Sequence, residues 1–128
     1  MPNDQPNVFD ANCGSREVLA LVADRWSMLV IYALRGEARR HGELKRTIGG
    51  ISQKMLTQTL RALERDGLVL RRDVAPVPRQ VEYELTALGK TLLVPLGAIC
   101  RWAEEHLPQV RAARSDAELT SRGETSAR

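Results

Sequence analysis

A chain of 128 residues can build one hydrophobic core with short tails, which excludes a large multidomain enzyme. Hydrophobic residues make up 43% and charged residues 27%, so a wholly disordered chain is excluded as well. The net charge of +3 is modest, but positions 35–79 hold eleven Lys and Arg against five Asp and Glu. This local excess is typical of a nucleic-acid-binding surface, and a solvated basic surface would give the same count.

No segment of the sequence has the pattern of membrane insertion or export. The longest nearly apolar stretch, 92–100, is interrupted by Pro95 and Gly97 and falls far short of the ~20 residues that a bilayer crossing needs. Residues 1–10 are polar and lack the basic and apolar regions of a secretory signal. We therefore expect a cytoplasmic protein, in which two distant cysteines remain reduced thiols.

The first elements in chain order are a polar arm and two helices. Residues 1–11 are expected to form a flexible arm. Apolar residues at three- and four-residue steps predict a short helix from Ser15 and a second, largely buried helix that Asp24 caps and Gly36 ends. A short segment over 44–48 follows and is closed by a Gly-Gly turn.

The next helix, predicted between Ser52 and Gly67, has two contrasting faces. Ser52 is placed to cap its first turn, and Gly67 to end it. Leu60 and Leu63 lie within about 40° of Leu56 around the helix axis, so these three should face the core. The opposite face is expected to carry three cations, two hydrogen-bonding residues and no acid: Lys54, Thr57, Gln58, Arg61 and Arg65.

Two β-like stretches, 68–71 and 81–85, predict a hairpin. The segment between them, 75–80, contains two prolines, which cannot donate to a sheet ladder. We therefore expect residues 75–80 to form a long loop with a basic tip.

A last helix is predicted over 87–106, where apolar residues recur at three- and four-residue steps. At about 1.5 Å per residue it would be roughly 30 Å long, more than so small a domain covers, so part of its apolar stripe needs a partner. Pro95 should bend this helix about one turn earlier. Residues 108–128 contain almost no large apolar side chain and are expected to be a disordered tail.

The order of these elements is that of a winged helix-turn-helix, a mainly α fold with a small β-hairpin wing. A major groove about 12 Å wide admits one helix, whose outer side chains reach base edges. The wing arginines would then meet phosphates or a minor groove. The candidate DNA-binding residues are Ser52, Gln53, Lys54, Thr57, Gln58, Arg61 and Arg65 on the helix, and Arg71, Arg72 and Arg79 on the wing.

Motifs spread in order over residues 12–107 resemble a known family. They include Ala23-Asp24-Arg25-Trp26, the run ISQKMLTQTLRALERDGLV at 51–69, and Val81-Glu82-Tyr83. This pattern resembles the HxlR-type family of bacterial winged helix-turn-helix regulators, which is related in fold to MarR-type proteins. The resemblance implies a homodimeric DNA-binding repressor or activator. It also implies dimer contacts from the first and last helices, here near Glu17 and at Leu92, Leu96 and Ile99.

Cys13 matches a position where this family often carries a cysteine, which in some members senses quinones, aldehydes or oxidants. The first turn of a helix and nearby Arg16 would lower the pKa of the thiol and raise its thiolate fraction. An unmodified thiol stays open as the alternative. Cys100 lies in an apolar run and is expected in the core or at the dimer seam.

The sequence thus predicts a transcriptional regulator, a repressor that acts as a homodimer on a near-palindromic operator, with a small electrophile or aromatic molecule as candidate effector. One alternative is a winged-helix module that binds protein and never touches DNA; another is a thiol-dependent catalyst using Cys13, for which no neighbouring base is identified.

Hydrolase, nucleotide-binding and zincin motifs are missing, and the histidines and cysteines lack the spacing of a zinc site. We therefore expect neither enzymatic activity nor a cofactor or metal. Trp26 and Trp102 are expected to anchor the core rather than line an effector pocket.

Overall fold

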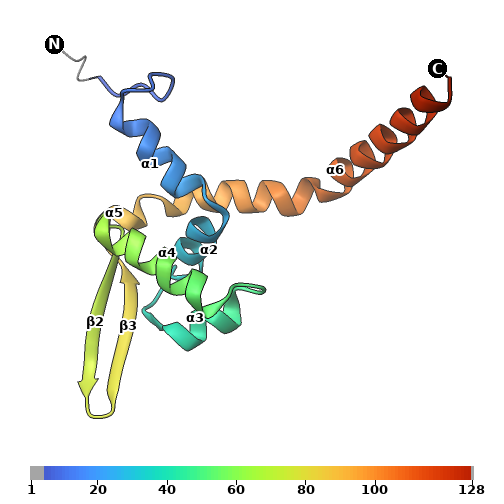
Figure 1. The fold of residues 1–128 in the computed structure, drawn as a ribbon. Helices are drawn as coiled ribbons and strands as arrows, with labels where there is room; N and C mark the ends of the chain where they lie inside the picture. Colours follow the sequence, from blue (N-terminus) through green and yellow to red (C-terminus); the bar gives the residue numbers. More distant parts are fainter. Residues whose placement is uncertain (1–4, 128) are drawn as a thin grey trace. The chain divides into compact units, whose positions relative to one another are not determined.

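The computed structural model describes residues 5–127, with side chains to residue 121, and the chain divides into two units, 1–93 and 94–128. The first unit holds every strand and all helices but most of the last (Figure 1). In chain order the elements are α1 (Gly14–Ala23), α2 (Arg25–Ala33), β1 (Arg39–Arg40), α3 (His41–Thr47), α4 (Gln53–Arg65), β2 (Val69–Pro76), β3 (Arg79–Leu85), α5 (Ala87–Lys90) and α6 (Leu93–Ala127).

Side-chain caps fix where three of these helices begin. Asp24 Oδ2 accepts hydrogen bonds from the backbone N–H groups of Trp26 and Ser27, each at 3.1 Å, and so caps α2. The Ser52 hydroxyl accepts from a backbone N–H of α4 at 3.0 Å, and the Thr86 hydroxyl does the same for α5. Gly67 ends α4 with a φ of +77°, a conformation that other residues rarely adopt. The predicted caps are confirmed.

The core of the first unit is built by α2, α3, α4 and the start of β2. Leu56, Leu60 and Leu63 of α4 are at most 1% exposed, which confirms the predicted inner face of this helix. Burying one such side chain contributes roughly 1.5–3 kcal/mol, so the three leucines hold α4 firmly in one rotation about its axis. The other large, fully buried side chains of this core are Val30, Ile31, Leu34, Leu44 and Val69.

The wing is longer and more regular than the sequence suggests. Three antiparallel strands lie in the order β1-β3-β2, and β2 pairs with β3 from Val69↔Leu85 to Pro76↔Arg79. The expected loop over 75–80 is therefore wrong, since only residues 77–78 form the turn. Pro76 is the last residue of β2, which is an edge strand, and edge strands are where sheets tolerate proline. No sequence pattern indicates the two-residue strand β1.

The predicted last helix is interrupted as expected, but more completely. α5 ends at Lys90 and α6 begins at Leu93, so the chain forms two helices rather than one bent helix. Pro95 lies in the first turn of α6, where the backbone N–H it lacks would have no helical partner.

Beyond Pro108 the sequence predicts a disordered tail, whereas the structure continues α6 to Ala127. Residues 111–119 are rich in Ala and Arg, which favour helix intrinsically, and their side chains are exposed. Although α6 is long, no helix in the described part of the chain combines the length and hydropathy of a bilayer-spanning segment.

Candidate nucleic-acid interface

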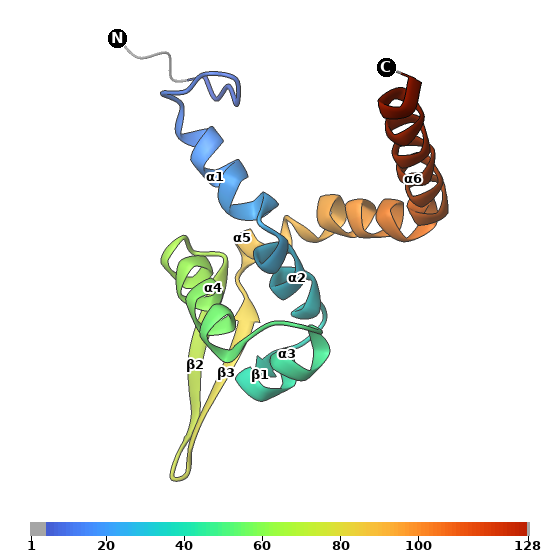
Figure 2. The same ribbon diagram turned by 45° about the vertical axis from the view of Figure 1, so that its right-hand side comes forward.

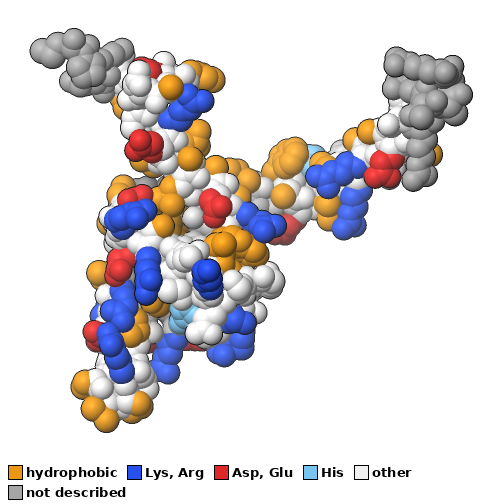
Figure 3. Space-filling view, viewed as in Figure 1, with side chains coloured by type: hydrophobic (Ala, Val, Ile, Leu, Met, Phe, Trp, Pro, Cys, Tyr) orange, Lys and Arg blue, Asp and Glu red, His pale blue; other side chains and the backbone are white. Residues whose placement is uncertain are grey.

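The outer side of α4 carries a polar and cationic surface opposite the three core leucines. Five of its side chains line one shallow hollow, and we call this surface the recognition face. Thr57 is half-buried at its centre, and the other members are exposed. Figure 3 shows Lys and Arg side chains gathered over α4 and along the wing. The recognition face consists of Gln53, Lys54, Thr57, Gln58 and Arg61.

Two further residues predicted on this helix have other neighbours. Ser52 uses its hydroxyl to cap α4, so its first role is structural. Arg65 is exposed near the end of α4, and its Nε lies 3.8 Å from a carboxylate oxygen of Asp66. Arg61 and Lys54 have no ion-pair partner among the described residues, which leaves both charges available to a ligand.

α4 and the wing lie side by side in the first unit, as both ribbon views show (Figures 1 and 2). A second hollow joins them, and Thr57 and Arg61 from the recognition face line it. Arg71 contributes from β2, and Tyr83 from β3. The helix and the wing therefore form one continuous surface.

Glu64 also lines this second hollow, so the expectation that the outer face of α4 has no acid is wrong. Seven residues make nearly two helical turns, which places Glu64 only about 20° from Thr57 around the helix. Helical geometry alone could have located it. A carboxylate here repels phosphate and thereby restricts which part of a nucleic acid can approach the junction.

The three predicted wing cations differ in their surroundings. Arg72 forms an ion pair with Glu84 of the neighbouring strand, and Arg79 Nε lies 3.6 Å from an Asp73 carboxylate oxygen. Arg71 has no ion pair within the described residues and points to the junction with α4. The sequence could not separate them, because pairing across the hairpin depends on its register.

This difference gives a direct prediction for DNA binding. Replacing Arg71 with Ala should lower affinity for every duplex and reduce the slope of log affinity against log salt by about 1, as expected for one lost phosphate contact. Replacing Arg72 with Ala should change this slope much less, because the Glu84 carboxylate already offsets that charge. Equal changes in the two salt titrations would contradict the assignment.

His41 is a neighbour of the recognition face that the sequence did not indicate. Its Nε2 lies 3.1 Å from the Thr57 hydroxyl oxygen. Partial burial lowers the pKa of His41, and the positive charge of Lys45 lowers it further. His41 and Thr57 lie 16 positions apart in the sequence and on different helices. The periodicity of a single helix or strand therefore could not have paired them.

Cys13 is partly exposed at the start of α1. Its Sγ lies 3.0 Å from the Ser15 hydroxyl and accepts a hydrogen bond from the Asn7 backbone N–H at 3.2 Å. The Ser15 side chain lowers the pKa of this thiol most, followed by the backbone N–H groups of Asn7 and Ser15, while desolvation and the negative charge of Asp10 oppose them. The predicted direction is confirmed, but hydrogen bonds cause it rather than Arg16.

The aromatic side chains do not anchor the core as expected. Trp102 is 56% exposed and stacks on the His106 ring with a centroid distance of 4.9 Å. Trp26 is half-buried, and the Arg25 guanidinium lies 4.3 Å from its ring centroid. Cys100 is half-buried. No group of three or more metal-ligating side chains occurs within the described residues.

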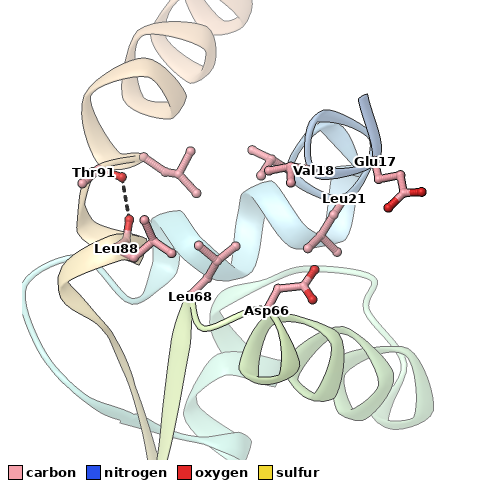
Figure 4. A pocket seen from close by; sticks show the side chains of 9 residues that line it. Glu17, Val18, Leu21, Asp66, Leu68, Leu88 and Thr91 are labelled. Carbon is pink, nitrogen blue, oxygen red and sulfur yellow. Dashed lines mark hydrogen bonds between the residues drawn. The ribbon is translucent and has the colours of Figure 1, made fainter. Parts of the chain in front are cut away.

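An apolar pocket of about 540 Å³ lies on the first unit between α1, α5 and the start of β2 (Figure 4). Neither tryptophan lines it. Two carboxylates stand among its mainly aliphatic walls, and the Thr91 hydroxyl donates to the Leu88 carbonyl at 2.6 Å. The lining residues are Glu17, Val18, Leu21, Val22, Asp66, Leu68, Leu88, Thr91 and Leu92.

Comparison with known proteins identifies the family. The model of the HxlR-like helix-turn-helix family matches residues 21–111. The chain belongs to this family. The HxlR-like chain is 46% identical over 110 residues to the uncharacterized HTH-type transcriptional regulator YtfH of Escherichia coli strain K12, covering 86% of this chain and 87% of YtfH.

Solved structures agree with the fold of this HxlR-like regulator. The structure of ytfH from Salmonella typhimurium matches with a TM-score of 0.80 and 45% identity, covering 87% of this chain and 99% of the other. The redox regulator HypR in its reduced form matches with a TM-score of 0.70 and 32% identity, covering 77% and 97%. The predicted winged helix-turn-helix fold is confirmed, and the chain is a non-enzymatic transcriptional regulator.

Proposed function

We propose that this HxlR-like chain is a sequence-specific repressor that binds a near-palindromic operator as a homodimer. Each protomer inserts α4 into one of two successive major grooves, about 34 Å apart, and lays its wing along the adjacent backbone. The recognition face reads base edges, and the wing arginines contact phosphates or a minor groove.

The observation that carries this proposal is the continuous surface over α4 and the wing. Three of its members, Lys54, Arg61 and Arg71, are cations without ion pairs among the described residues. Thr57 and Gln58 add hydrogen-bonding groups between them. Free cations supply affinity for phosphate and for guanine, while amide and hydroxyl groups distinguish the other bases.

Exposed apolar side chains on two helices support the dimer. None of the residues of α1 is buried, and Val18 and Leu19 are 57% and 51% exposed. On α6, Val94 and Ile99 are 80% and 50% exposed. Of the three contacts implied by the family resemblance, Ile99 has the most surface left to bury, Leu92 has some and Leu96 is already buried. Covering such surface in a second copy would be favourable.

Site selection from random duplex tests this function. The full chain should enrich a near-palindrome whose half-sites lie one helical turn apart, and sedimentation should give a dimer with and without DNA. A monomer that binds no duplex at low salt would contradict the proposal. That result would favour the alternative, a winged-helix module that binds protein only.

The proposal extends to Cys13 as the group that responds to electrophiles or oxidants. The relative HypR is a redox regulator solved in reduced and oxidized forms. In this chain, hydrogen bonds from Ser15 and Asn7 lower the pKa of the Cys13 thiol, and the thiolate is the nucleophile in such reactions. Operator affinity should therefore fall after quinone treatment of the wild type and not of Cys13→Ser.

The pH dependence of Cys13 alkylation tests the cause of this reactivity. In a Cys100→Ser background, the rate should reach half its plateau at a pH below the ordinary thiol pKa, because hydrogen bonds stabilise the thiolate. Replacing Ser15 with Ala removes the largest stabilising contact and should move the midpoint upward. The measurement is iodoacetamide modification followed by mass spectrometry, and an unchanged midpoint in the Ser15 variant would refute the explanation.

A further inference from the structure

The hydrogen bond between His41 and Thr57 connects the two helices of the helix-turn-helix. His41 is the first residue of α3 and is half-buried, and its Nε2 lies 3.1 Å from Thr57 Oγ1 in the middle of α4. Among the described residues, His41 is the hydrogen-bond partner of the Thr57 hydroxyl. A side chain at the centre of the recognition face is thus held from a different helix.

This contact decides how Thr57 is oriented. A threonine inside a helix ordinarily divides between two rotamers, because its hydroxyl can also bond to a carbonyl of the preceding turn. The His41 ring instead directs Oγ1 toward α3, and the methyl group must take one of the remaining staggered positions. Neither the sequence nor the backbone of α4 alone would select that arrangement.

Thr57 lies where orientation matters most. It is the one residue besides Arg61 that lines both the hollow on α4 and the hollow beside the wing. It is half-buried, whereas its neighbours on the recognition face are exposed. A short, recessed side chain can reach a base edge in few conformations, so a fixed rotamer avoids an ordering cost on binding.

The hydrogen-bonding state of the ring also limits what Thr57 can offer. Burial and Lys45 lower the pKa of His41, which favours a neutral ring with one donor and one acceptor nitrogen. A hydroxyl has one proton and two lone pairs. The bond to His41 Nε2 uses either this proton or one of the lone pairs, and only the other groups of the Thr57 hydroxyl remain available to a base.

We propose that His41 is a positioning residue for base recognition, which fixes the Thr57 side chain and thereby sets which base pair α4 favours opposite it. His41 acts through Thr57 and not by its own contact with a base. The inference rests on the proposed function, since it requires α4 to enter the major groove.

The test compares variants of the full chain on operators in which each base pair is replaced in turn. Thr57→Val removes the hydroxyl and should reduce discrimination at one base pair by about 2- to 10-fold, the effect of one net hydrogen bond. His41→Phe keeps a planar ring without nitrogens and should reduce discrimination at the same base pair. His41→Gln places an amide near the Nε2 position and should preserve discrimination at this base pair. The shorter side chain of His41→Asn does not reach that position and should reduce it.

The double variant distinguishes a positioning role of His41, exerted through Thr57, from a general contribution of His41 to the fold. With Thr57→Val already present, His41→Phe should cause no further loss at that base pair. Additive losses, or a loss from His41→Phe that is equal at every base pair, would overturn the proposal. If His41→Phe fails to fold, the contrast between the Gln and Asn variants decides. A wild type without selectivity for any duplex would reject the proposed function as well, whereas a selective wild type with uncoupled effects rejects only this inference.

Discussion

Replacing Arg61 with Ala is expected to weaken operator binding by roughly 10- to 100-fold and to relax selectivity at one base pair in each half-site. Arg61 is exposed on the recognition face and lines both hollows, so its guanidinium lies at the junction of α4 and the wing. It has no ion pair among the described residues, so no carboxylate of the protein offsets the charge that it presents to DNA. Titration of labelled operator duplexes measures both effects.

Arg65→Ala is the matched control on the same helix. Arg65 lies outside the recognition face and close to the Asp66 carboxylate. Its replacement should lower affinity for all duplexes alike and by less, since it removes a partly offset charge. If Arg61→Ala leaves affinity and selectivity unchanged, or if Arg65→Ala has the stronger effect on selectivity, α4 does not read bases through Arg61.

Local patterns in the sequence are sufficient to place α4 and its faces. The Ser52 cap, the buried leucines and Gly67 act within a few residues of one another, and helical periodicity relates them without knowledge of the fold. Most of the recognition face follows from the same periodicity. This is why the face predicted from the sequence and the hollow on α4 share Lys54, Thr57, Gln58 and Arg61.

The remaining features of the site depend on contacts between distant segments. The sequence predicts too short a wing because proline argues against a strand interior, and only the strand order reveals that Pro76 lies on an edge. The pairing of Arg72 with Glu84 requires the hairpin register. The contact of His41 with Thr57 requires the packing of α3 on α4. None of these has a local signature.

The second prediction concerns Gly89, for which substitution by Ala should lower the free energy of unfolding by about 3 kcal/mol, as severe overpacking does. Gly89 is buried in α5, and a Cβ there would overlap the Leu68 carbonyl oxygen and approach Leu85 Cδ2 to 3.3 Å. The Leu68 carbonyl cannot move away easily, because it accepts the Thr86 backbone N–H at 3.1 Å. Urea denaturation at fixed protein concentration gives the measurement.

Gly42→Ala provides the control for this substitution. Gly42 lies in α3, and the nearest atom to an added Cβ would be the end of the flexible Arg46 side chain at 3.5 Å. Alanine should therefore be neutral or stabilise the protein by roughly 0.5–1 kcal/mol through its helix preference. Leu68 lies between α4 and β2, so a Gly89→Ala substitution that displaces Leu68 should also weaken DNA binding. Equal stability of the two variants would mean that α5 does not pack closely against the base of the wing.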